Sequence, residues 1–475
     1  TPSSIPAAAR MNRPECTETA ANKEGHTMKS IKRGERLTIL LIVLFLLGMV
    51  LLVARIVSQA TFYMSHSHNV KLGYIYDRNG EVLFDENATA EKYGADYFLD
   101  VGNLIGDNSG RMTNTLVSEN LKDLQNYNLL FGAVQNGKSA IYTTLDHDAN
   151  QQVYQEFGNK NGTAIAYNYQ TGEILVCVSK PSVNILSDVD VSTLETGSLL
   201  CKAFYQTIPG STQKVCTTAA AIETIGYDAL MQKSYDCQGT YYNNYGSPIR
   251  CYHGSVHGWQ NISQAFQHSC NPWFAQLVED LPLDGLQTAF RKMGYQVNGE
   301  GSTQMDLDGI SVFTASTTLE DTNDSITQWG CIGQGETVIS PLQLMMWESA
   351  IANGTGQVTQ PYLISYRQDL FGTVKDKAKT TYSDEIFSAE TAQQVRAIMR
   401  ENGDLARYSV INYPVGLKTG TAEQGDGTDN SLLVGFCDDS NLPIAFCIEI
   451  EDWNQDVDTV NTNNIARTML NALSQ

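Results

Sequence analysis

The feature that most constrains this chain is an uncharged apolar run, LTILLIVLFLLGMVLLVA, at residues 37–54. Its length is close to the ~20 residues that a helix needs to cross a hydrocarbon core of roughly 30 Å. The basic segment KRGER at residues 32–36 directly precedes it, and positive charge marks the cytoplasmic end of a spanning helix. We therefore expect residues 1–36 to be a basic cytoplasmic tail, residues 37–58 to be a transmembrane signal anchor, and the remainder to lie outside the membrane.

Two other interpretations of the apolar run compete with the anchor. A cleaved signal peptide has an apolar region of ~7–15 residues that ends in a small-x-small cleavage site, whereas this run is longer and continues into Arg-Ile-Val-Ser-Gln from Arg55. A buried helix of a soluble protein is the weaker alternative. Met28 lies shortly before the basic segment, so we expect residues 1–27 to be an extension with no folded role.

The anchor separates two regions of opposite charge. The chain carries a formal net charge of −21, but its first 36 residues hold seven basic and four acidic residues, which leaves −24 for the rest. An acidic surface repels phosphate and does not displace its counterions, so this balance excludes most nucleic-acid binders. We therefore expect no nucleic-acid partner.

The part beyond the anchor is expected to contain two domains. Residues 59–155 include a strand-turn-strand candidate at 72–84, with Asn79-Gly80 at its turn, and a polar helical stretch at 116–128. We expect this segment to form a small, pedestal-like juxtamembrane domain. Residues 156–475 are then expected to form a second, larger domain.

The larger domain begins and ends with strand hairpins. The first occupies residues 163–179, with a turn at Gln170-Thr171-Gly172, and the second occupies residues 431–450 before a terminal helix at 460–474. Most residues between the hairpins have the pattern of helices and loops. We therefore expect an α/β (α+β) fold in which a central antiparallel sheet, built from both ends of the domain, is flanked by helices.

The strongest candidate for chemistry is the segment IPGSTQKV at 208–215, because the alanine-rich run 216–225 that follows it favours a buried helix. Ser211 and Lys214 are three residues apart and share a helix face, so the amine can lie beside the hydroxyl as a base beside a nucleophile. To act as a base near neutral pH, Lys214 needs a pKa lowered by about three units, which requires about 4 kcal/mol of cation destabilisation. A serine helix cap with a solvated lysine is the structural alternative, since Ser-x-x-Lys is expected about once by chance.

Two further segments complete a catalytic pattern. Leu417-Lys418-Thr419-Gly420-Thr421 precedes the last hairpin and is expected to be a strand beside it. Its cation, hydroxyls and glycine suit a site that binds a carboxylate and admits a peptide backbone. Ser269-Cys270-Asn271 lies between Ser211 and Lys418 in the chain. Asn271-Pro272 also suits the cap and the first residue of a helix, and both roles can hold together.

These segments resemble the three motifs of penicillin-binding proteins and serine β-lactamases. Ser211-x-x-Lys214, Ser269-x-Asn271 and Lys418-Thr419-Gly420 occur in that family's order and at its long separations. The opening hairpin at 161–181 and the segment 332–343 are also similar to the family's corresponding elements. The resemblance therefore extends well beyond the motifs.

The resemblance is to the class B, or monofunctional, penicillin-binding proteins. Residues 59–155 are too few to contain the glycosyltransferase domain of the bifunctional class. The segment Tyr76–Leu83, YDRNGEVL, resembles the start of the N-terminal region of the monofunctional class. The fold that this resemblance implies is the penicillin-binding-protein transpeptidase fold at residues 156–475.

The activity that the resemblance implies is that of a peptidoglycan D,D-transpeptidase, which forms a serine acyl-enzyme and is acylated by penicillin. Ser211 would attack the D-Ala-D-Ala carbonyl of a donor stem peptide with Lys214 as its base, and the amine of an acceptor stem would resolve the acyl-enzyme. Ser269 and Asn271 would relay protons and orient Lys214. The remaining implied roles belong to binding: Lys418, Thr419 and Thr421 would hold the substrate carboxylate, Gly420 would leave room for it, and the backbone N–H groups of Ser211 and Thr421 would form the oxyanion hole.

The resemblance also implies a location and a partner. Proteins of this class lie in the bacterial cell membrane through one N-terminal helix, with the catalytic domain outside the cytoplasm. They usually work beside a polytopic glycan polymerase of the shape, elongation, division and sporulation family. The sequence does not separate a role in division from one in elongation or sporulation. A D,D-carboxypeptidase and a non-catalytic β-lactam sensor or scaffold are alternatives on the same fold, as is a β-lactamase, for which no motif supplies a deacylating base.

The cysteines and histidines predict no cofactor and no metal site. Ten cysteines without a C-x-x-C pair are too few for a disulfide scaffold and match no zinc motif. Cys237 and Cys251 flank a polar, aromatic loop and are either a disulfide or two separate thiols, and Cys270 is expected to be a small buried filler. The other polar residues near the motifs are expected to have ordinary structural roles: His253, His257 and His268 in loops or packing, and Glu336 and Glu423 as solvated or capping carboxylates.

Overall fold

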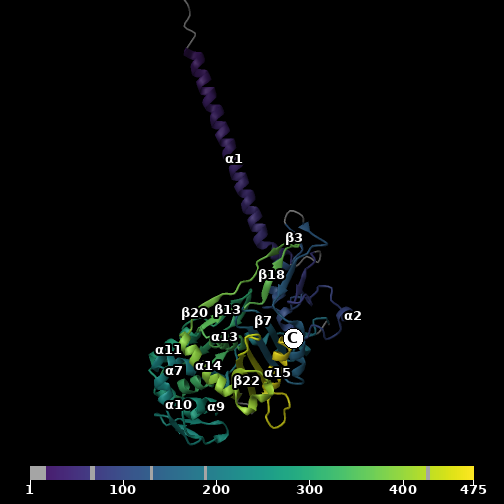
Figure 1. The fold of residues 1–475 in the computed structure, drawn as a ribbon. Coiled ribbons are helices and arrows are strands. Elements are labelled where there is room, and N and C mark those ends of the chain that lie inside the picture. The colour runs from purple at the N-terminus through teal and green to yellow at the C-terminus, as the bar shows by residue number, and fades with distance from the viewer. Residues whose placement is uncertain (1–17, 65–69, 129–131, 187–189, 424–427) are drawn as a thin grey trace, which may run out of the picture. The chain divides into compact units, whose positions relative to one another are not determined.

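The computed structural model describes residues 18–64, 70–128, 132–186, 190–423 and 428–475, and it divides the chain into two units, residues 1–69 and 70–475. In the first unit, α1 (Glu18–Met64) is one continuous helix (Figure 1). Its exposed segment Ile31–Val57 is long and apolar enough to cross a membrane. The predicted apolar span is therefore helical, and the helix continues into the predicted tail, of which residues 1–17 lie outside the described residues.

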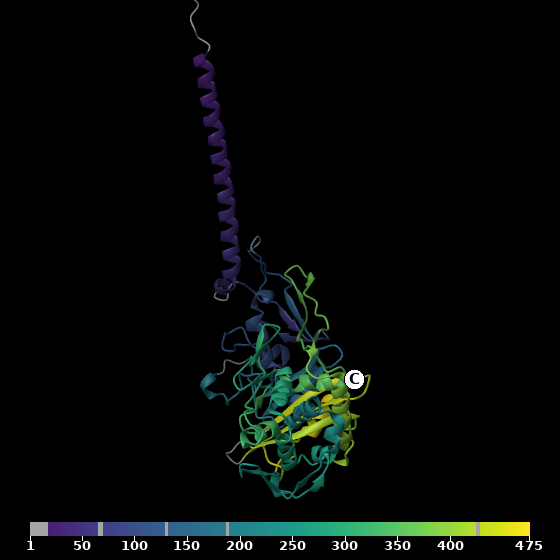
Figure 2. The same ribbon diagram turned by 90° about the vertical axis from the view of Figure 1, so that its left-hand side faces the viewer.

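The second unit is built on a five-stranded antiparallel sheet in the order β21-β22-β23-β6-β7. The two predicted hairpins are both present: β6 (Gly162–Asn168) pairs with β7 (Ile174–Lys180), and β22 (Asp429–Cys437) pairs with β23 (Ile444–Trp453). β23 also pairs with β6, so strands from the two ends of the domain are neighbours. β21 (Val415–Glu423) pairs with β22 and forms one edge of the sheet. Figure 2 shows the yellow and yellow-green C-terminal strands side by side within this unit, and the predicted central sheet is confirmed.

The central sheet buries side chains on both faces because its strands are apolar at nearly every position. In β23, Phe446 and Ile448 belong to one core cluster, whereas Ala445 and Cys447 belong to another. Successive side chains of a strand point to opposite faces of the sheet. The sheet therefore needs a layer of helices on each face.

Both faces of the central sheet are covered. On one face, α6 (His147–Glu156) and α15 (Thr462–Leu473) contribute Val153 and Ile465 to the core cluster. On the other face lies α13 (Pro341–Ala352), all of whose residues are buried. α13 begins with a cap at Ser340, whose side chain accepts from the Gln343 N–H, and with a proline in its first turn. α15 confirms the predicted terminal helix.

A second sheet crosses the predicted domain boundary. β1 (Tyr74–Tyr76) and β2 (Val82–Phe84) form the predicted strand-turn-strand unit. Their sheet is completed by β5 (Ala140–Thr143) and by two strands from far along the chain, β18 (Ile364–Gln368) and β19 (Val374–Lys375). The two predicted domains therefore share this sheet, and residues 70–475 form one compact unit.

The helical stretch predicted at residues 116–128 is helical only in part. α4 (Leu116–Glu119) ends at Asn120, whose backbone is not helical, and α5 (Leu121–Leu124) is followed by β3 (Tyr127–Asn128). The other helices of the second unit that are not placed below are α2 (Ala90–Tyr93), α3 (Gly102–Ile105), α8 (Tyr227–Gln232), α11 (Leu283–Lys292), α12 (Ser325–Ile332) and α14 (Ala389–Gly403). The corresponding strands are β4 (Gly132–Ala133), β12 (Tyr295–Val297), β13 (Gln304–Leu307), β14 (Ile310–Phe313), β15 (Ala315–Thr317), β16 (Val338–Ile339), β17 (Gln357–Thr359) and β20 (Tyr382–Glu385).

The helices that carry the first two motifs lie at one end of the second unit, opposite β3 and β18 (Figure 1). These helices are α7 (Lys214–Ile225), α9 (Ile262–Gln267) and α10 (Asn271–Glu279). Two short antiparallel ribbons are inserted between them in the chain. They pair β8 (Tyr235–Cys237) with β11 (Gly258–Gln260), and β9 (Thr240–Tyr242) with β10 (Pro248–Arg250).

Candidate active site

Ser211 lies in a tight turn that packs against β21. The turn, η3 (Gly210–Gln213), is a 3-10 helix that leads directly into α7, so the predicted helix start is observed. Gly210 has a φ of 53°, and a Cβ at this position would lie 2.6 Å from the Thr421 carbonyl oxygen. A Cβ at Gly333 would lie 1.8 Å from the Gly210 carbonyl oxygen. Only glycine permits these approaches, which hold the Ser211 turn between β21 and the loop after α12.

The amine of Lys214 is the centre of the site. The side chain is fully buried, and Nζ lies 2.8 Å from Ser211 Oγ. Nζ also donates to the Ser269 carbonyl oxygen at 2.8 Å and to Asn271 Oδ1 at 2.6 Å. Burial lowers the pKa of Lys214 to about 7. A neutral amine has two N–H donors and one lone pair, and because two carbonyl oxygens accept the donors, the lone pair is left for the Ser211 hydroxyl.

Lys418 extends this network from β21. Its side chain is buried, and Nζ donates to Ser269 Oγ at 2.9 Å and to the Thr419 carbonyl oxygen at 2.7 Å. Ser269 Oγ is also 3.3 Å from Lys214 Nζ, so this hydroxyl bridges the two lysines. Burial lowers the pKa of Lys418, and the positive charges of Lys214 and Arg407 lower it further. Two amines and two hydroxyls thus form a continuous hydrogen-bonded path along which a proton can move.

Asn271 presents its amide to Lys214 in a fixed orientation. Oδ1 accepts from Lys214, while Nδ2 donates to the Arg250 carbonyl oxygen at 3.0 Å. Asn271 is the first residue of α10, and Cys270 occupies the cap position. The predicted capping role of Asn271 is therefore wrong, because its amide is used by the site. The predicted first-turn proline, Pro272, is present.

β21 carries the third motif along one edge of the central sheet. Thr419 and Thr421 are half-buried and Gly420 is buried. A Cβ at Gly420 would lie 2.9 Å from the Pro209 carbonyl oxygen and 3.0 Å from Thr212 Cγ2. The glycine therefore lets the Ser211 turn pack on the strand, a structural reason in addition to the room for substrate that the sequence suggests.

The three motifs meet at a cleft of about 880 Å³. Because β21 is an edge strand, its outer backbone edge can pair with an extended peptide. The arrangement can therefore hold a peptide carbonyl next to a nucleophile and its base. Further residues complete the lining, among them Arg250 of β10, Tyr252, His268, Trp329 of α12 and Glu423 of β21.

Arg407 is a contributor to the site that the sequence analysis did not predict. It donates to the Gln267 carbonyl oxygen at 2.5 Å and to Asn402 Oδ1 at 3.1 Å, and its charge lowers the pKa of Lys418. No local pattern marks it, because its effect depends on how the loop after α14 packs. Glu336 and Glu423 are exposed, as expected.

Four metal-ligand-type side chains that the sequence analysis treated separately come together beside the cleft. They are Cys237, Cys251, His257 and Cys270, and their ligand atoms all lie within 4.8 Å of one another. Cys237 and Cys251 are free thiols, so the disulfide alternative is not formed in this structure. His257 is not a simple loop residue, since its Nδ1 faces the sulfur atoms. The group has no C-x-x-C spacing, and its one signal in the sequence is the concentration of cysteine and histidine at residues 237–270.

Comparison with known families and sequences gives consistent results. Residues 162–471 match the family described as the penicillin binding protein transpeptidase domain. The chain is 29% identical over 308 residues to Stage V sporulation protein D of Bacillus subtilis, which covers 60% of this chain and 45% of that protein. It is 26% identical over 348 residues to the peptidoglycan D,D-transpeptidase PbpA of Mycolicibacterium smegmatis, covering 66% of this chain and 67% of the relative. The match thus spans less than half of the Bacillus protein.

Solved structures share the fold at low sequence identity. PBPA from Mycobacterium tuberculosis aligns with a TM-score of 0.71 and 20% identity, covering 85% of this chain and all of that chain. The D,D-transpeptidase domain of a peptidoglycan glycosyltransferase from Eggerthella lenta aligns with a TM-score of 0.69 and 19% identity, covering 85% of this chain and 98% of that one. The predicted fold class is confirmed.

Proposed function

Because the chain belongs to the family of penicillin-binding protein transpeptidase domains, we propose that it is a membrane-anchored peptidoglycan D,D-transpeptidase that acts through a serine acyl-enzyme. The observation that carries this proposal is the buried amine of Lys214, 2.8 Å from Ser211 Oγ and with a pKa of about 7. A base of this kind is half neutral at neutral pH, where it can accept the serine proton. The relatives named as D,D-transpeptidases support the substrate class.

The first half of the reaction is acylation. Ser211 Oγ attacks the carbonyl carbon between the two terminal D-Ala residues while its proton passes to Lys214 Nζ. The oxyanion that forms is stabilised by the backbone N–H groups of Ser211 and Thr421, on the turn and strand that Gly210 brings into contact. As the C–N bond breaks, the leaving amine of D-Ala takes up a proton through Ser269 Oγ, which lies 3.3 Å from Lys214 Nζ.

The second half is transfer to the acceptor. The amine of a neighbouring stem attacks the ester carbonyl, loses a proton to Lys214, and displaces Ser211 Oγ, which is reprotonated. In both halves of the reaction, Asn271 Oδ1 and the Ser269 carbonyl oxygen accept the two N–H groups of the neutral Lys214 amine. The lone pair of the amine therefore stays directed at Ser211 Oγ.

The substrate carboxylate is held at β21. A carboxylate near Lys418 favours the protonated amine, so binding offsets the effect of burial on the Lys418 pKa. The hydroxyls of Thr419 and Thr421, which are half-buried on the edge strand, donate to the same carboxylate. Gly420 keeps the strand close to the Ser211 turn.

The proposed topology follows from α1. The basic tail at residues 1–36 lies in the cytoplasm, the apolar part of α1 crosses the membrane, and residues 70–475 lie outside it, where the peptide substrate is found. A polytopic glycan polymerase of the shape, elongation, division and sporulation family is the proposed partner. Contact would be made through the anchor and the region before residue 155.

Labelling with a fluorescent penicillin tests the enzyme proposal. The full chain in detergent should be labelled, and mass spectrometry should place the adduct on Ser211, whereas Ser211→Ala should not be labelled. Absence of an adduct on Ser211 in the wild-type chain would overturn the proposal. With stem-peptide substrates, cross-linked dimers identify a transpeptidase, release of D-Ala without dimers identifies a carboxypeptidase, and rapid hydrolysis of the penicillin adduct identifies a β-lactamase.

A further inference from the structure

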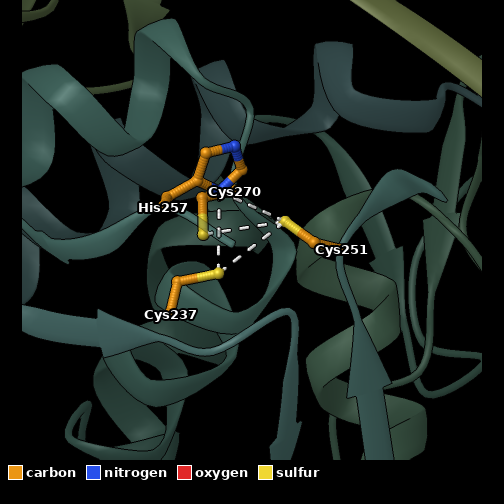
Figure 3. A group of neighbouring side chains, drawn as sticks. All are labelled: Cys237, Cys251, His257 and Cys270. Atoms are coloured by element: carbon orange, nitrogen blue, oxygen red, sulfur yellow. Dashed lines mark hydrogen bonds between the residues drawn. The ribbon is translucent and has the colours of Figure 1, made fainter. Parts of the chain in front are cut away.

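The side chains of Cys237, Cys251, His257 and Cys270 point toward a common centre (Figure 3). We propose that they bind one Zn²⁺ ion in a tetrahedral site, and that this ion fixes the second catalytic motif. Three thiolates and one imidazole are a donor set typical of structural zinc. These four residues are called the Cys3His cluster below.

Four of the six donor–donor distances within the Cys3His cluster are close to the edges of a tetrahedron around zinc, and the other two are no longer than 4.8 Å. With Zn–S bonds of ~2.3 Å and a Zn–N bond of ~2.0–2.1 Å, a regular tetrahedron has S···S edges of about 3.8 Å and S···N edges of about 3.6 Å. The Sγ atoms of Cys251 and Cys270 are 3.8 Å apart, and those of Cys237 and Cys251 are 4.0 Å apart. His257 Nδ1 lies 3.6 Å from Cys237 Sγ and 3.5 Å from Cys251 Sγ. The four donors therefore need only small movements to bind the ion.

The surroundings of the Cys3His cluster suit a structural ion. The three cysteines are buried and His257 is half-buried. The ring of His268 stacks on that of His257, with centroids 4.9 Å apart and planes 7° apart, which holds the imidazole with Nδ1 toward the sulfur atoms. Cys251 and His257 also line the catalytic cleft, which gives the ion and a chelator a route to the site.

The ribbons that supply these ligands need a cross-link of this kind. β8 to β11 are strands of three residues each, and small sheets of this size bury little apolar surface. Large side chains in the segment are exposed, including Tyr242, Tyr245, Val256 and Trp259. Small units without a sufficient core are commonly stabilised by a metal or by disulfides.

The Cys3His cluster is joined directly to the catalytic residues. Cys270 is the middle residue of the second motif, between Ser269 and Asn271. On the other side, Asn271 Nδ2 donates to the carbonyl oxygen of Arg250, the residue before Cys251. An ion that holds Cys251 against Cys270 therefore fixes both contacts of the Asn271 amide and the Ser269 carbonyl. The four ligands are positioning residues for Lys214, and this consequence rests on the proposed function.

Metal analysis of the full chain tests the site itself. The protein, purified in detergent with its thiols reduced, should contain about one zinc per chain, measured by mass spectrometry of the elements. His257→Asn and Cys237→Ser should lose the metal. His253→Asn, in the same exposed loop, and Cys437→Ser, a buried cysteine of β22, are the matched controls and should keep it.

A spectroscopic measurement on the wild-type protein tests the site without depending on whether the variants fold. Wild-type protein stripped by a chelator and loaded with Co²⁺ should show thiolate-to-cobalt charge transfer and the strong visible bands of a tetrahedral cobalt site. If the stripped wild-type protein shows neither feature after Co²⁺ has been added, the proposed metal site is overturned. A disulfide between Cys237 and Cys251 in protein purified with zinc present and without a chelator also overturns it.

The effect on chemistry is measured separately from metal binding. Stripping zinc should slow penicillin acylation by roughly tenfold or more, and zinc should restore the rate. An unchanged rate after stripping overturns the positioning role. Ser211→Ala keeps the zinc and loses acylation, so a failure of the proposed enzyme activity does not resemble a failure of the metal site.

Discussion

Replacement of Lys214 by methionine should change the pH dependence of stability in a direction that the structure fixes. The pKa of Lys214 is about 7 in the folded chain because the side chain is buried, whereas in the unfolded chain it is close to the ordinary value of about 10.4. Between these two values the unfolded chain binds more protons, so stability rises with pH in this window. Lys214→Met removes this titration and keeps a side chain of similar length.

The size of the effect follows from the two pKa values. When the pH falls from 9 to 7, the linkage relation gives a decrease of about 2 kcal/mol in the free energy of unfolding from Lys214 alone. Costs that do not depend on pH, such as the hydrogen bonds lost to Ser269 and Asn271, cancel when the two pH values are compared within each protein. The wild-type chain should therefore lose about 2 kcal/mol more than Lys214→Met over this interval.

Urea unfolding in detergent at both pH values measures this difference. All five tryptophans lie in residues 70–475, so their fluorescence reports on that unit and not on α1. Penicillin acylation by the wild-type chain should rise with pH through about 7 and be lower by about 10²- to 10⁴-fold in Lys214→Met. Equal pH dependence of stability in the two proteins would refute the conclusion that Lys214 is a base with a strongly lowered pKa.

Four further substitutions test the packing and a buried carboxyl group. Gly333→Ala, whose Cβ would lie 1.8 Å from the Gly210 carbonyl oxygen, should destabilise the chain by more than ~2 kcal/mol and slow acylation. Gly246→Ala, also at positive φ but with open space around its Cβ among the described residues, should cost only ~1 kcal/mol, and equal losses in urea unfolding would contradict the close-contact argument. Glu348→Gln should stabilise the chain more at pH 7 than at pH 4, because burial raises the pKa of this carboxyl and the folded state loses stability as pH rises above the unfolded value; a larger gain at pH 4 would count against it. Ile448→Ala, in the core of the central sheet, should cost ~2–5 kcal/mol in the same assay, and a loss below ~1 kcal/mol would be inconsistent with its burial.

The central sheet could be predicted from the sequence because its information is local. The hairpins at 163–179 and 431–450 combine apolar strands with short polar turns, and each is read within about 20 residues. The site at Ser211, Ser269 and Lys418 was predicted from the resemblance of their motifs to those of a known family. That resemblance indicates which distant segments of the chain lie together, which local patterns cannot do. In the structure, Lys214 contacts both Ser211 and Ser269, and Ser269 also contacts Lys418.

The features that the sequence did not predict depend on contacts between distant segments. The capping role expected for Asn271 failed because Lys214 and the Arg250 carbonyl compete for its amide. The sheet of the N-terminal region needs β18, which lies more than two hundred residues after β5. The Cys3His cluster has no short motif, because its ligands come from two ribbons and a helix start.

The glycine contacts around the Ser211 turn have a consequence for the order of events during folding. Ser211 and Lys214 are neighbours in every conformation of the chain, but in the unfolded chain the lysine keeps its ordinary pKa and is not a base for the serine. The reactive pair forms only after Gly333, β21 and the second motif have closed around the turn. With the proposed topology and activity, a chain that has not finished folding outside the membrane should be insensitive to β-lactams, and the appearance of penicillin reactivity should mark the completion of its folding.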